Sequence, residues 1–545
     1  MFEFRYYLEN ELIKTESSNE DVVIFKEKKG NHFKVTIKAL KDITLESSII
    51  SFKFAFSRHE TLFVNGYQSW TDTKEHIIMD QHRNIKKFHH FVNKKYALDK
   101  YGDSSFVKYQ HRVMHGIDVA YIRGFNNLFI GSINYENAYL VINFKIINRI
   151  VELLSDIKGK TLKAGEEFVL YNYYMDQEIQ NGFKAYIKNF SIPKVKKIIG
   201  YTSWYNHYQN INETIIYNAL KGMDSSTYNL FQIDDGYETY VGDWLDVDPV
   251  KFPAGLKGIV DDVHAKGLMA GIWLAPFVAE EKSKLFKEHP EFIKRDEKGK
   301  MIKAGGNWSG FYPLDLERED VKAYIRKCLE HYMNMGFDFF KLDFLYACNL
   351  GPSNLTRAER SQQSYAFLRE TLKNRLILGC GAIISNSYKN FDYLRIGPDV
   401  SLKFDDTFIM RLMHRERIST KVTIQNTIFR SMFDGFLFGN DPDVFLLRDD
   451  NIKLNKKQKE SLIIINAIFG SLLMTSDNIS EYDEEKKALL ARAINIFTNA
   501  TDKFFQKTSN NRILIRYRID GELVKLKYNS KKGVLIYGQK LDNIW

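Results

Sequence analysis

The chain has 545 residues, of which 44% are hydrophobic and 27% are charged, a composition that excludes a largely disordered protein. Its 78 basic and 68 acidic side chains give a formal net charge of +10, but no basic run is long or interleaved with aromatic residues, so we expect no nucleic-acid partner. With no apolar run near the ~18 residues of a membrane span, no secretory signal at the start and only three cysteines, we expect a cytoplasmic protein without a membrane partner or a disulfide framework.

Residues 1–192 alternate between hydrophobic and polar positions in short runs. Residues 32–38 and 139–144 show this period of two, and turn residues such as Asn65 and Gly66 separate the runs. Short alternating strands with frequent turns are typical of two packed antiparallel sheets. We therefore expect an N-terminal β-sandwich over residues 1–192.

Residues 193–500 change to apolar runs that alternate with amphipathic helical patterns, among them 317–335, 358–373 and 457–467. The eight candidate strands are residues 198–204, 229–234, 268–276, 337–344, 376–381, 393–399, 435–439 and 471–476. Eight strands alternating with helices predict a central (β/α)8 TIM barrel in an α/β protein. An open doubly wound sheet alternates in the same way, but neither its dinucleotide motif nor a P-loop follows the first strand.

Residues 501–545 return to the period of two. Three short strands are predicted over 512–518, 522–528 and 533–537, and turns at Asp520 and Gly521 and at residues 531–533 join them. We expect a small C-terminal antiparallel β-domain packed on the barrel.

The chemistry of such a barrel lies at the carboxyl ends of its strands. Asp234 and Asp235 end the second candidate strand, and Trp273 lies in the third. In the fourth strand the period of two places Lys341 and Asp343 on one face, so we expect both to point into the barrel, with Asp343 nearest the opening. The opposite face, which suits the helix layer, carries Phe340, Leu342 and Phe344.

The sixth candidate strand places Arg395 and Asp399 on one face by the same rule. A single Asp at a strand end is usually a turn or helix-cap residue, and Lys341 with Asp343 can be a structural ion pair. Several carboxylates at one opening, however, repel one another unless a ligand, a metal or a reaction uses them. Their number favours a functional site.

Two carboxylates that face each other across the opening suit glycoside hydrolysis, in which one attacks the anomeric carbon and the other protonates the leaving oxygen. Asp343, kept ionised by Lys341, is the expected nucleophile, and Asp399 is the expected proton donor. Asp234 and Asp235 are expected to accept hydrogen bonds from sugar hydroxyls. Five tryptophans that could reach the cleft offer faces on which sugars stack. They are Trp70, Trp204, Trp244, Trp273 and Trp308.

Six motifs together resemble glycoside hydrolase family 36, the melibiase-type α-galactosidases. They are Asn-Gly-Tyr-Gln-Ser-Trp at 65–70, Gln-Ile-Asp-Asp-Gly-Tyr at 232–237, Gly-Ile-Trp-Leu-Ala-Pro-Phe at 271–277, Lys-Leu-Asp-Phe at 341–344, Arg-Ile-Gly-Pro-Asp at 395–399 and Gly-Asn-Asp-Pro-Asp at 439–443. The resemblance covers nearly the whole chain, and ordered motifs are far more specific than any one of them. It implies that Asp343 is the nucleophile and Asp399 the acid/base of a retaining enzyme.

The resemblance also assigns substrate contacts to seven further side chains. These are Asp234 and Asp235 at the galactose O4 and O6 hydroxyls, Lys341 at the ring hydroxyls, Trp273 at a wall of the subsite, Arg395 and Cys380 near O2, and Trp70 on a loop that the first domain lends to the cleft. No cofactor or metal is implied. The expected partner is a small α-galactoside.

The resemblance implies an exo-α-galactosidase that acts on substrates such as melibiose or raffinose through a covalent galactosyl-aspartate. Three alternatives stay open: an α-N-acetylgalactosaminidase on the same scaffold, a transglycosylase, and a non-catalytic sugar-binding protein. The presence of both candidate catalytic aspartates speaks against the last. The sequence also leaves open a homo-oligomer and the balance between hydrolysis and transglycosylation.

Overall fold

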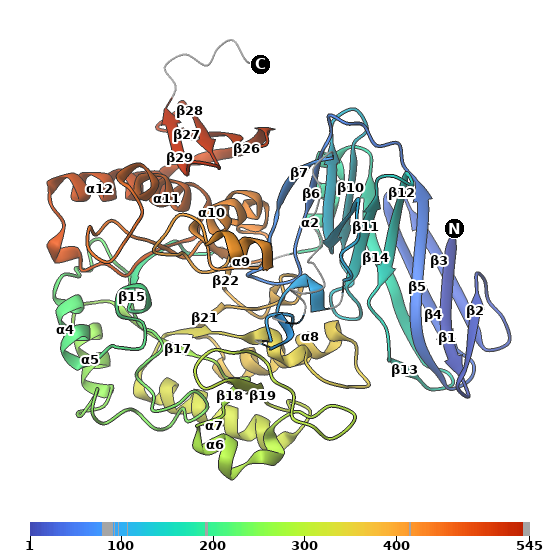
Figure 1. Ribbon diagram of the computed structural model, residues 1–545, viewed down its shortest axis with the longest axis horizontal. Coiled ribbons are helices and arrows are strands. Elements are labelled where there is room, and N and C mark those ends of the chain that lie inside the picture. The colour runs from blue at the N-terminus through green and yellow to red at the C-terminus, as the bar shows by residue number, and fades with distance from the viewer. Residues whose placement is uncertain are drawn as a thin grey trace.

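The computed structural model describes residues 1–78, 91, 93–95, 97–105, 107–190, 195–413 and 416–537. Two antiparallel sheets, a curled parallel sheet with helices on its outside and a small antiparallel sheet follow one another along the chain (Figure 1). The expected boundary between residues 192 and 193 lies outside the described residues. No helix among these residues combines the length and apolar character that crossing a bilayer requires.

The first part of the chain packs two antiparallel sheets face to face around one apolar core, as the alternation predicts. One sheet contains, in spatial order, β2 (Glu11–Thr15), β1 (Phe2–Leu8), β5 (Ile43–Lys53), β12 (Ile150–Ser155), β11 (Leu140–Lys145) and β8 (Val113–Ile117), with β13 (Thr161–Leu162) paired to β5. The other contains β3 (Val22–Lys29), β4 (His32–Ala39), β14 (Glu167–Asp176), β10 (Leu128–Ser132), β9 (Val119–Arg123), β6 (Thr61–Val64) and β7 (Lys74–Ile77). Helix α2 (Ile179–Ile187) follows.

The central sheet has nine parallel strands and is curled, so that its two edge strands are consecutive in the chain. In spatial order it contains β23 (Gly439–Asp441), β22 (Tyr393–Arg395), β21 (Leu376–Gly379), β20 (Phe339–Leu342), β17 (Met269–Leu274), β16 (Leu230–Ile233), β15 (Ile198–Thr202), β25 (Leu472–Thr475) and β24 (Val444–Phe445). Only Pro442 and Asp443 separate β23 from β24. The carboxyl ends of all the parallel strands therefore open on the same side.

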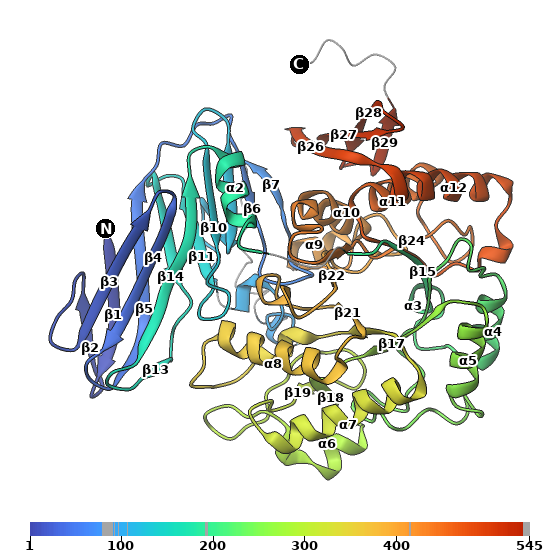
Figure 2. The ribbon, with the colours of Figure 1, turned by 180° about the vertical axis from the view of Figure 1, so that it is seen from behind.

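Helices surround this sheet and the loops at its ends (Figures 1 and 2). They are α3 (Trp204–His207), α4 (Glu213–Lys221), α5 (Lys257–Ala265), α6 (Lys284–Glu288), α7 (Glu319–Met335), α8 (Arg357–Leu372), α9 (Phe408–Met413), α10 (Thr420–Phe429), α11 (Lys456–Phe469) and α12 (Glu484–Asn499). Local signals set their ends: Thr356 and Glu359 form a capping box that starts α8, and Gly336, with φ of 112°, ends α7. β18 (Val278–Glu280) and β19 (Phe311–Pro313) pair as a separate two-stranded antiparallel sheet.

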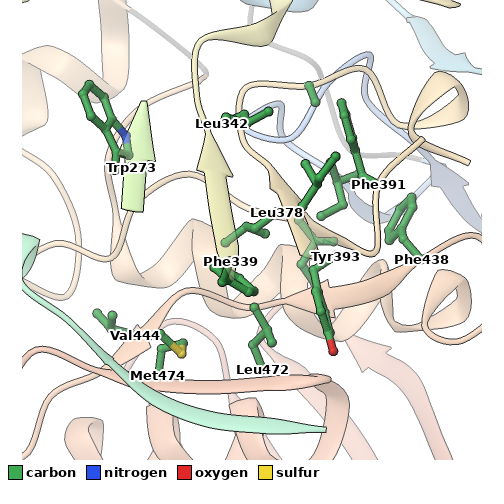
Figure 3. Packing of buried hydrophobic residues seen from close by; sticks show 14 of the residues in the cluster. Trp273, Phe339, Leu342, Leu378, Phe391, Tyr393, Phe438, Val444, Leu472 and Met474 are labelled. Atoms are coloured by element: carbon green, nitrogen blue, oxygen red, sulfur yellow. The ribbon is translucent and has the colours of Figure 1, made fainter. Parts of the chain in front are cut away.

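The strands of the curled sheet are buried on both faces, which explains their nearly continuous apolar sequence. Figure 3 shows side chains from separate strands, among them Phe339, Leu378, Leu472 and Met474, gathered in one cluster of buried hydrophobic residues. This cluster gives the carboxyl ends of the strands a rigid support.

All eight strand predictions overlap a parallel strand, but the prediction over 435–439 does so only at Gly439. The strand β23 begins only at Gly439. Gly435 has φ of 73°, and its N–H donates to the carbonyl of Phe438, so these residues turn although they are apolar. The shift brings Asp441 and Asp443 to the carboxyl end of the sheet.

The C-terminal sheet has four antiparallel strands where three were predicted. They are β26 (Thr501–Ser509), β27 (Arg512–Ile519), β28 (Glu522–Asn529) and β29 (Val534–Tyr537). The additional strand, β26, is polar and only partly buried, so it lacks the alternation that signals a strand. The sheet lies over α11 and α12 (Figure 1), where the N–H of Leu535 donates to Oγ of Ser461 at 2.8 Å.

Candidate active site

A cavity of about 390 Å³ lies at the carboxyl ends of the parallel strands, and loops of the β-sandwich reach its rim. Seven of the nine side chains proposed from the sequence line it. They are Trp70, Asp234, Asp235, Trp273, Lys341, Asp343 and Asp399. The other two, Cys380 and Arg395, are buried behind the wall, and each interacts with one of the two carboxylates proposed to be catalytic. Their direct contact with a sugar stays a prediction.

Asp343 directly follows β20 and is held by donors from the neighbouring strands. Nε1 of Trp273, on β17, donates to Asp343 Oδ2 at 3.0 Å, and the Cys380 thiol beside β21 donates to the same carboxylate. Burial raises the pKa of Asp343, and the charge of Asp399 adds to the rise. The charge of Lys341 and the two hydrogen bonds oppose it without cancelling it. The ionised form of Asp343 is therefore less stable here than in water, a perturbation that is common at functional sites.

Lys341 forms an ion pair with Asp234, where the sequence favoured a pair with Asp343. Its Nζ lies 2.8 Å from Asp234 Oδ2, and both side chains are buried. Burial lowers the pKa of Lys341, but the charge of Asp234, together with smaller contributions from Cys380 and Asp343, outweighs it, so the net pKa is raised. Asp234 also accepts hydrogen bonds from Gln232 at 2.7 Å and from Thr202 at 2.9 Å. These bonds to Oδ2 hold the carboxylate in place, and Oδ1, which accepts from the N–H of Asp235, retains a lone pair for a sugar hydroxyl.

Asp235 is fixed by side chains from two loops, and this arrangement includes a carboxyl group that the sequence analysis missed. Gln209 Nε2 and Trp308 Nε1 each donate to Asp235 at 3.0 Å. Glu238 is buried beside it, and burial followed by the charge of Asp235 raises the Glu238 pKa well above its usual range. The hydrogen bond between the two carboxyl groups adds to the rise in the pKa of Glu238 and opposes the rise that burial causes in the pKa of Asp235. In the sequence, only the position of Glu238, three residues after Asp235, could have indicated that it belongs to the site.

Asp399 is the more exposed of the two proposed catalytic carboxylates, with 32% of its side chain accessible. Arg395 lies behind it and donates from Nη1 to Asp399 Oδ1 at 2.9 Å. The same guanidinium pairs with Asp441 at 2.7 Å and with Asp443 at 2.8 Å. Both aspartates belong to the Gly-Asn-Asp-Pro-Asp motif, so this motif holds Arg395, and Arg395 in turn orients Asp399.

Aromatic side chains form the outer wall of the cavity, and here two expectations need correction. Phe344 was expected among the helices, but β20 ends at Leu342 and the φ of 55° at Phe344 directs its ring into the cavity wall. Trp244 does not line the cavity: it is 1% exposed and packs edge-to-face on Trp273, with ring centroids 5.7 Å apart. The remaining four tryptophans expected near the cleft do line it.

Leu98, Tyr101, Glu416 and Ile418 also line the rim and were not proposed from the sequence. They lie in loops without a regular pattern, so no periodicity pointed to them. Among the residues described, no group of three or more His, Cys, Asp or Glu side chains has an arrangement that could hold a metal ion.

Comparison with known proteins shows what this chain is similar to. The family model described as Melibiase matches residues 172–397, which include Asp234, Asp235 and Asp343. α-Galactosidase 1 of Pediococcus pentosaceus is 26% identical over 197 residues. The match covers 34% of this chain and 26% of that protein, so the chain corresponds to about a quarter of its relative's length.

Two solved structures share the fold over most of the chain. TtGalA, an α-galactosidase from Thermus thermophilus in complex with p-nitrophenyl α-D-galactopyranoside, has a TM-score of 0.71 and 22% identity. The similarity covers 93% of this chain and 98% of that one. The GH36 α-galactosidase AgaA from Geobacillus stearothermophilus has a TM-score of 0.63 and 12% identity, over 96% of this chain and 81% of that one.

Proposed function

We propose that the chain is a melibiase-type member of glycoside hydrolase family 36 and that it removes terminal α-linked galactose from small galactosides with retention of configuration. One observation carries the proposal: Asp343 and Asp399 line the same cavity at the carboxyl end of a curled parallel sheet. A pair of carboxylates on either side of a glycosidic bond is the arrangement that most glycoside hydrolases use.

In the proposed reaction Asp343 attacks the anomeric carbon while Asp399 gives its proton to the leaving oxygen. The result is a covalent galactosyl ester on Asp343. Asp399 then takes a proton from water, which attacks the ester and releases galactose. The environments suit the two roles, because Asp343 is enclosed and held by Trp273 and Cys380 while Asp399 faces the accessible side of the cavity.

We assign the sugar contacts to the carboxylates whose positions are fixed by neighbouring side chains. Asp234, paired with Lys341, and Asp235, held by Gln209 and Trp308, are positioned to accept the O4 and O6 hydroxyls of galactose. Trp273 would form the floor and Trp70 part of the rim. A cavity of about 390 Å³ suits a small ligand, and TtGalA binds p-nitrophenyl α-galactoside in its solved structure.

The proposed architecture places this reaction in a (β/α)8 barrel over residues 193–500, between a β-sandwich over 1–192 and a β-domain over 501–545. A barrel of eight strands is obtained when β23 and β24 are counted as one interrupted strand, since only two residues separate them. We also propose that the enzyme is cytoplasmic and works without a cofactor. Self-association into a homo-oligomer is left open.

The function is tested with the purified chain and a panel of p-nitrophenyl α-glycosides of galactose, N-acetylgalactosamine and glucose. We expect the highest kcat/KM for the galactoside, and proton NMR should detect α-galactose as the first product. Preference for the N-acetylgalactosaminide would support the alternative activity on the same scaffold. First release of β-galactose would rule out retention, and binding of galactose without turnover would indicate a sugar-binding protein.

Replacing Cys380 with alanine should shift the acidic limb of the pH–kcat/KM profile to higher pH. Asp343 must be ionised to attack, so activity falls as the pH drops through the pKa of Asp343. The Cys380 thiol lowers this pKa by donating to the carboxylate, and its removal leaves burial less opposed, so the pKa rises further. Cys328→Ala is the matched control because Cys328 is buried in α7, away from the cavity. An unshifted limb in Cys380→Ala would contradict the contact.

A further inference from the structure

Arg430 directly follows α10 and has no exposed surface. No ion pair involves it among the residues that the structure describes, although buried arginines usually pair with a carboxylate. Burial lowers the pKa of Arg430 to about 9, and the charges of Asp103 and Asp72 oppose this only in part. Burying a guanidinium without an ion-pair partner costs free energy, so we examined which atoms accept its hydrogen bonds.

The guanidinium donates to six oxygen atoms, five of which belong to one loop of the β-sandwich. The acceptors in this loop, residues 65–71, are Asn65 Oδ1 at 3.1 Å, Ser69 O at 2.6 Å, Gln68 O at 3.0 Å, Gly66 O at 3.3 Å and Thr71 Oγ1 at 3.4 Å. The sixth is the carbonyl of Ile396, at 2.9 Å. Ile396 lies between Arg395 and Asp399, so Arg430 connects the loop to the strand end that carries the proposed acid/base.

The same loop carries Trp70 to the cavity. The ring of Trp70 packs edge-to-face on Phe344, with centroids 5.3 Å apart, and a Cβ at Gly381 would come within 3.0 Å of it. Two other contacts hold the loop from its sides. Ser69 exchanges hydrogen bonds with Ala382 at 2.9 and 3.0 Å, and Asn426, one turn before Arg430, donates to the carbonyl of Thr71 at 2.9 Å.

We propose that Arg430 is a positioning residue that holds the 65–71 loop on the barrel and thereby places Trp70 in the wall of the substrate cavity. Only a planar fork of five N–H donors can reach acceptors in this many directions; a lysine ammonium has three donors and no fixed plane. The kinetic readout of this proposal rests on the proposed galactosidase function, whereas its structural readout does not.

The structural test is hydrogen–deuterium exchange, followed by mass spectrometry, on Arg430→Lys and the wild-type chain. We expect amides of residues 65–73 to exchange at least about tenfold faster in Arg430→Lys, because their loop loses the guanidinium that binds five of its oxygen atoms. Arg369→Met is the matched control. Arg369 also donates to backbone carbonyls, those of Asn390, Lys373 and Arg375, but it lies far from the loop. Its loss should leave exchange in 65–73 unchanged.

The kinetic test is a double-mutant cycle with Trp70→Ala on the nitrophenyl galactoside. Arg430→Lys should lower kcat/KM about 100-fold in the wild-type background, since small misplacements in an active site cost that much. In the Trp70→Ala background the loss should be at least several-fold smaller, because Trp70 is then absent. A merely destabilising change would reduce activity equally in both backgrounds.

Unchanged exchange in residues 65–73, or equal kinetic losses in both backgrounds, would overturn the proposal. If Arg430→Lys does not fold, Asn65→Ala tests the same contact, since it removes the acceptor of Nε together with one further hydrogen bond, from Asn65 Nδ2 to the carbonyl of Ile117. Asn65→Ala should give a smaller rise in exchange that is confined to the same loop. Unchanged exchange there would also refute the positioning role of Arg430. A wild-type chain without galactosidase activity would refute the proposed function while the exchange result still decides the role of Arg430.

Discussion

Replacement of Asp343 with alanine is expected to lower kcat on galactosides by about 10⁴-fold or more while the fold stays intact. The loss follows because no other side chain can form the ester with the anomeric carbon. Folding should not suffer, since burial disfavours the ionised carboxylate and alanine removes that cost. Steady-state kinetics with circular dichroism of the purified variant measure both effects.

Added azide provides the sharper readout of this variant. A small anion can occupy the space left by the Asp343 side chain and attack the anomeric carbon from the same face. Because Asp399 is still present to protonate the leaving group, the product should be β-galactosyl azide, with inverted configuration. Its absence, together with residual activity near the wild-type level, would refute Asp343 as the nucleophile.

Asp338→Ala is the matched control, since Asp338 precedes the same strand at its opposite end. It accepts hydrogen bonds from Arg375 at 3.0 Å and from the N–H of Ala270 at 3.1 Å, so its loss should cost about 1 to 3 kcal/mol of stability. Residues at the amino end of a barrel strand serve stability rather than chemistry. The kcat/KM per folded molecule should therefore be unchanged in Asp338→Ala.

The sequence predicted the site best where a side chain lies within a regular strand. Lys341 and Asp343 point to the cavity because alternation holds along β20. The rule failed one residue later, at Phe344, because the strand had ended and a left-handed backbone turned the ring inward. It failed again over 435–439, where an apolar run that resembles a strand forms a turn. Alternation carries no information once the strand has ended.

Partners of charged residues could not be predicted from the sequence at all. Lys341 was expected beneath Asp343, but the neighbouring strand β16 brings Asp234 to it instead. The sequence analysis did not single out Arg430, and only the folded chain places five oxygens of the 65–71 loop around it. Asp234 lies 107 residues from Lys341 and Ser69 lies 361 residues from Arg430, and no local pattern can report contacts over such separations.

Replacement of Asp399 with alanine should separate substrates by their leaving groups. Natural galactosides such as melibiose leave as alkoxides and need a proton, so their kcat/KM should fall by about 10²- to 10⁴-fold, the usual contribution of a general acid. A dinitrophenyl galactoside leaves without a proton and should lose much less in the first step. Hydrolysis of the galactosyl ester should then limit its turnover, because water lacks its base.

The anomer of the azide product distinguishes the two carboxylates in one experiment. In Asp399→Ala the galactosyl ester on Asp343 still forms, and azide needs no base to attack it from the α face. The product should therefore be α-galactosyl azide, the opposite anomer to that expected from Asp343→Ala. Equal losses for melibiose and the dinitrophenyl galactoside, or β-galactosyl azide from Asp399→Ala, would remove Asp399 from the acid/base role. Because Arg395 holds Asp399 with Asp441 and Asp443 behind it, the outcome also tests whether this network supports a proton donor.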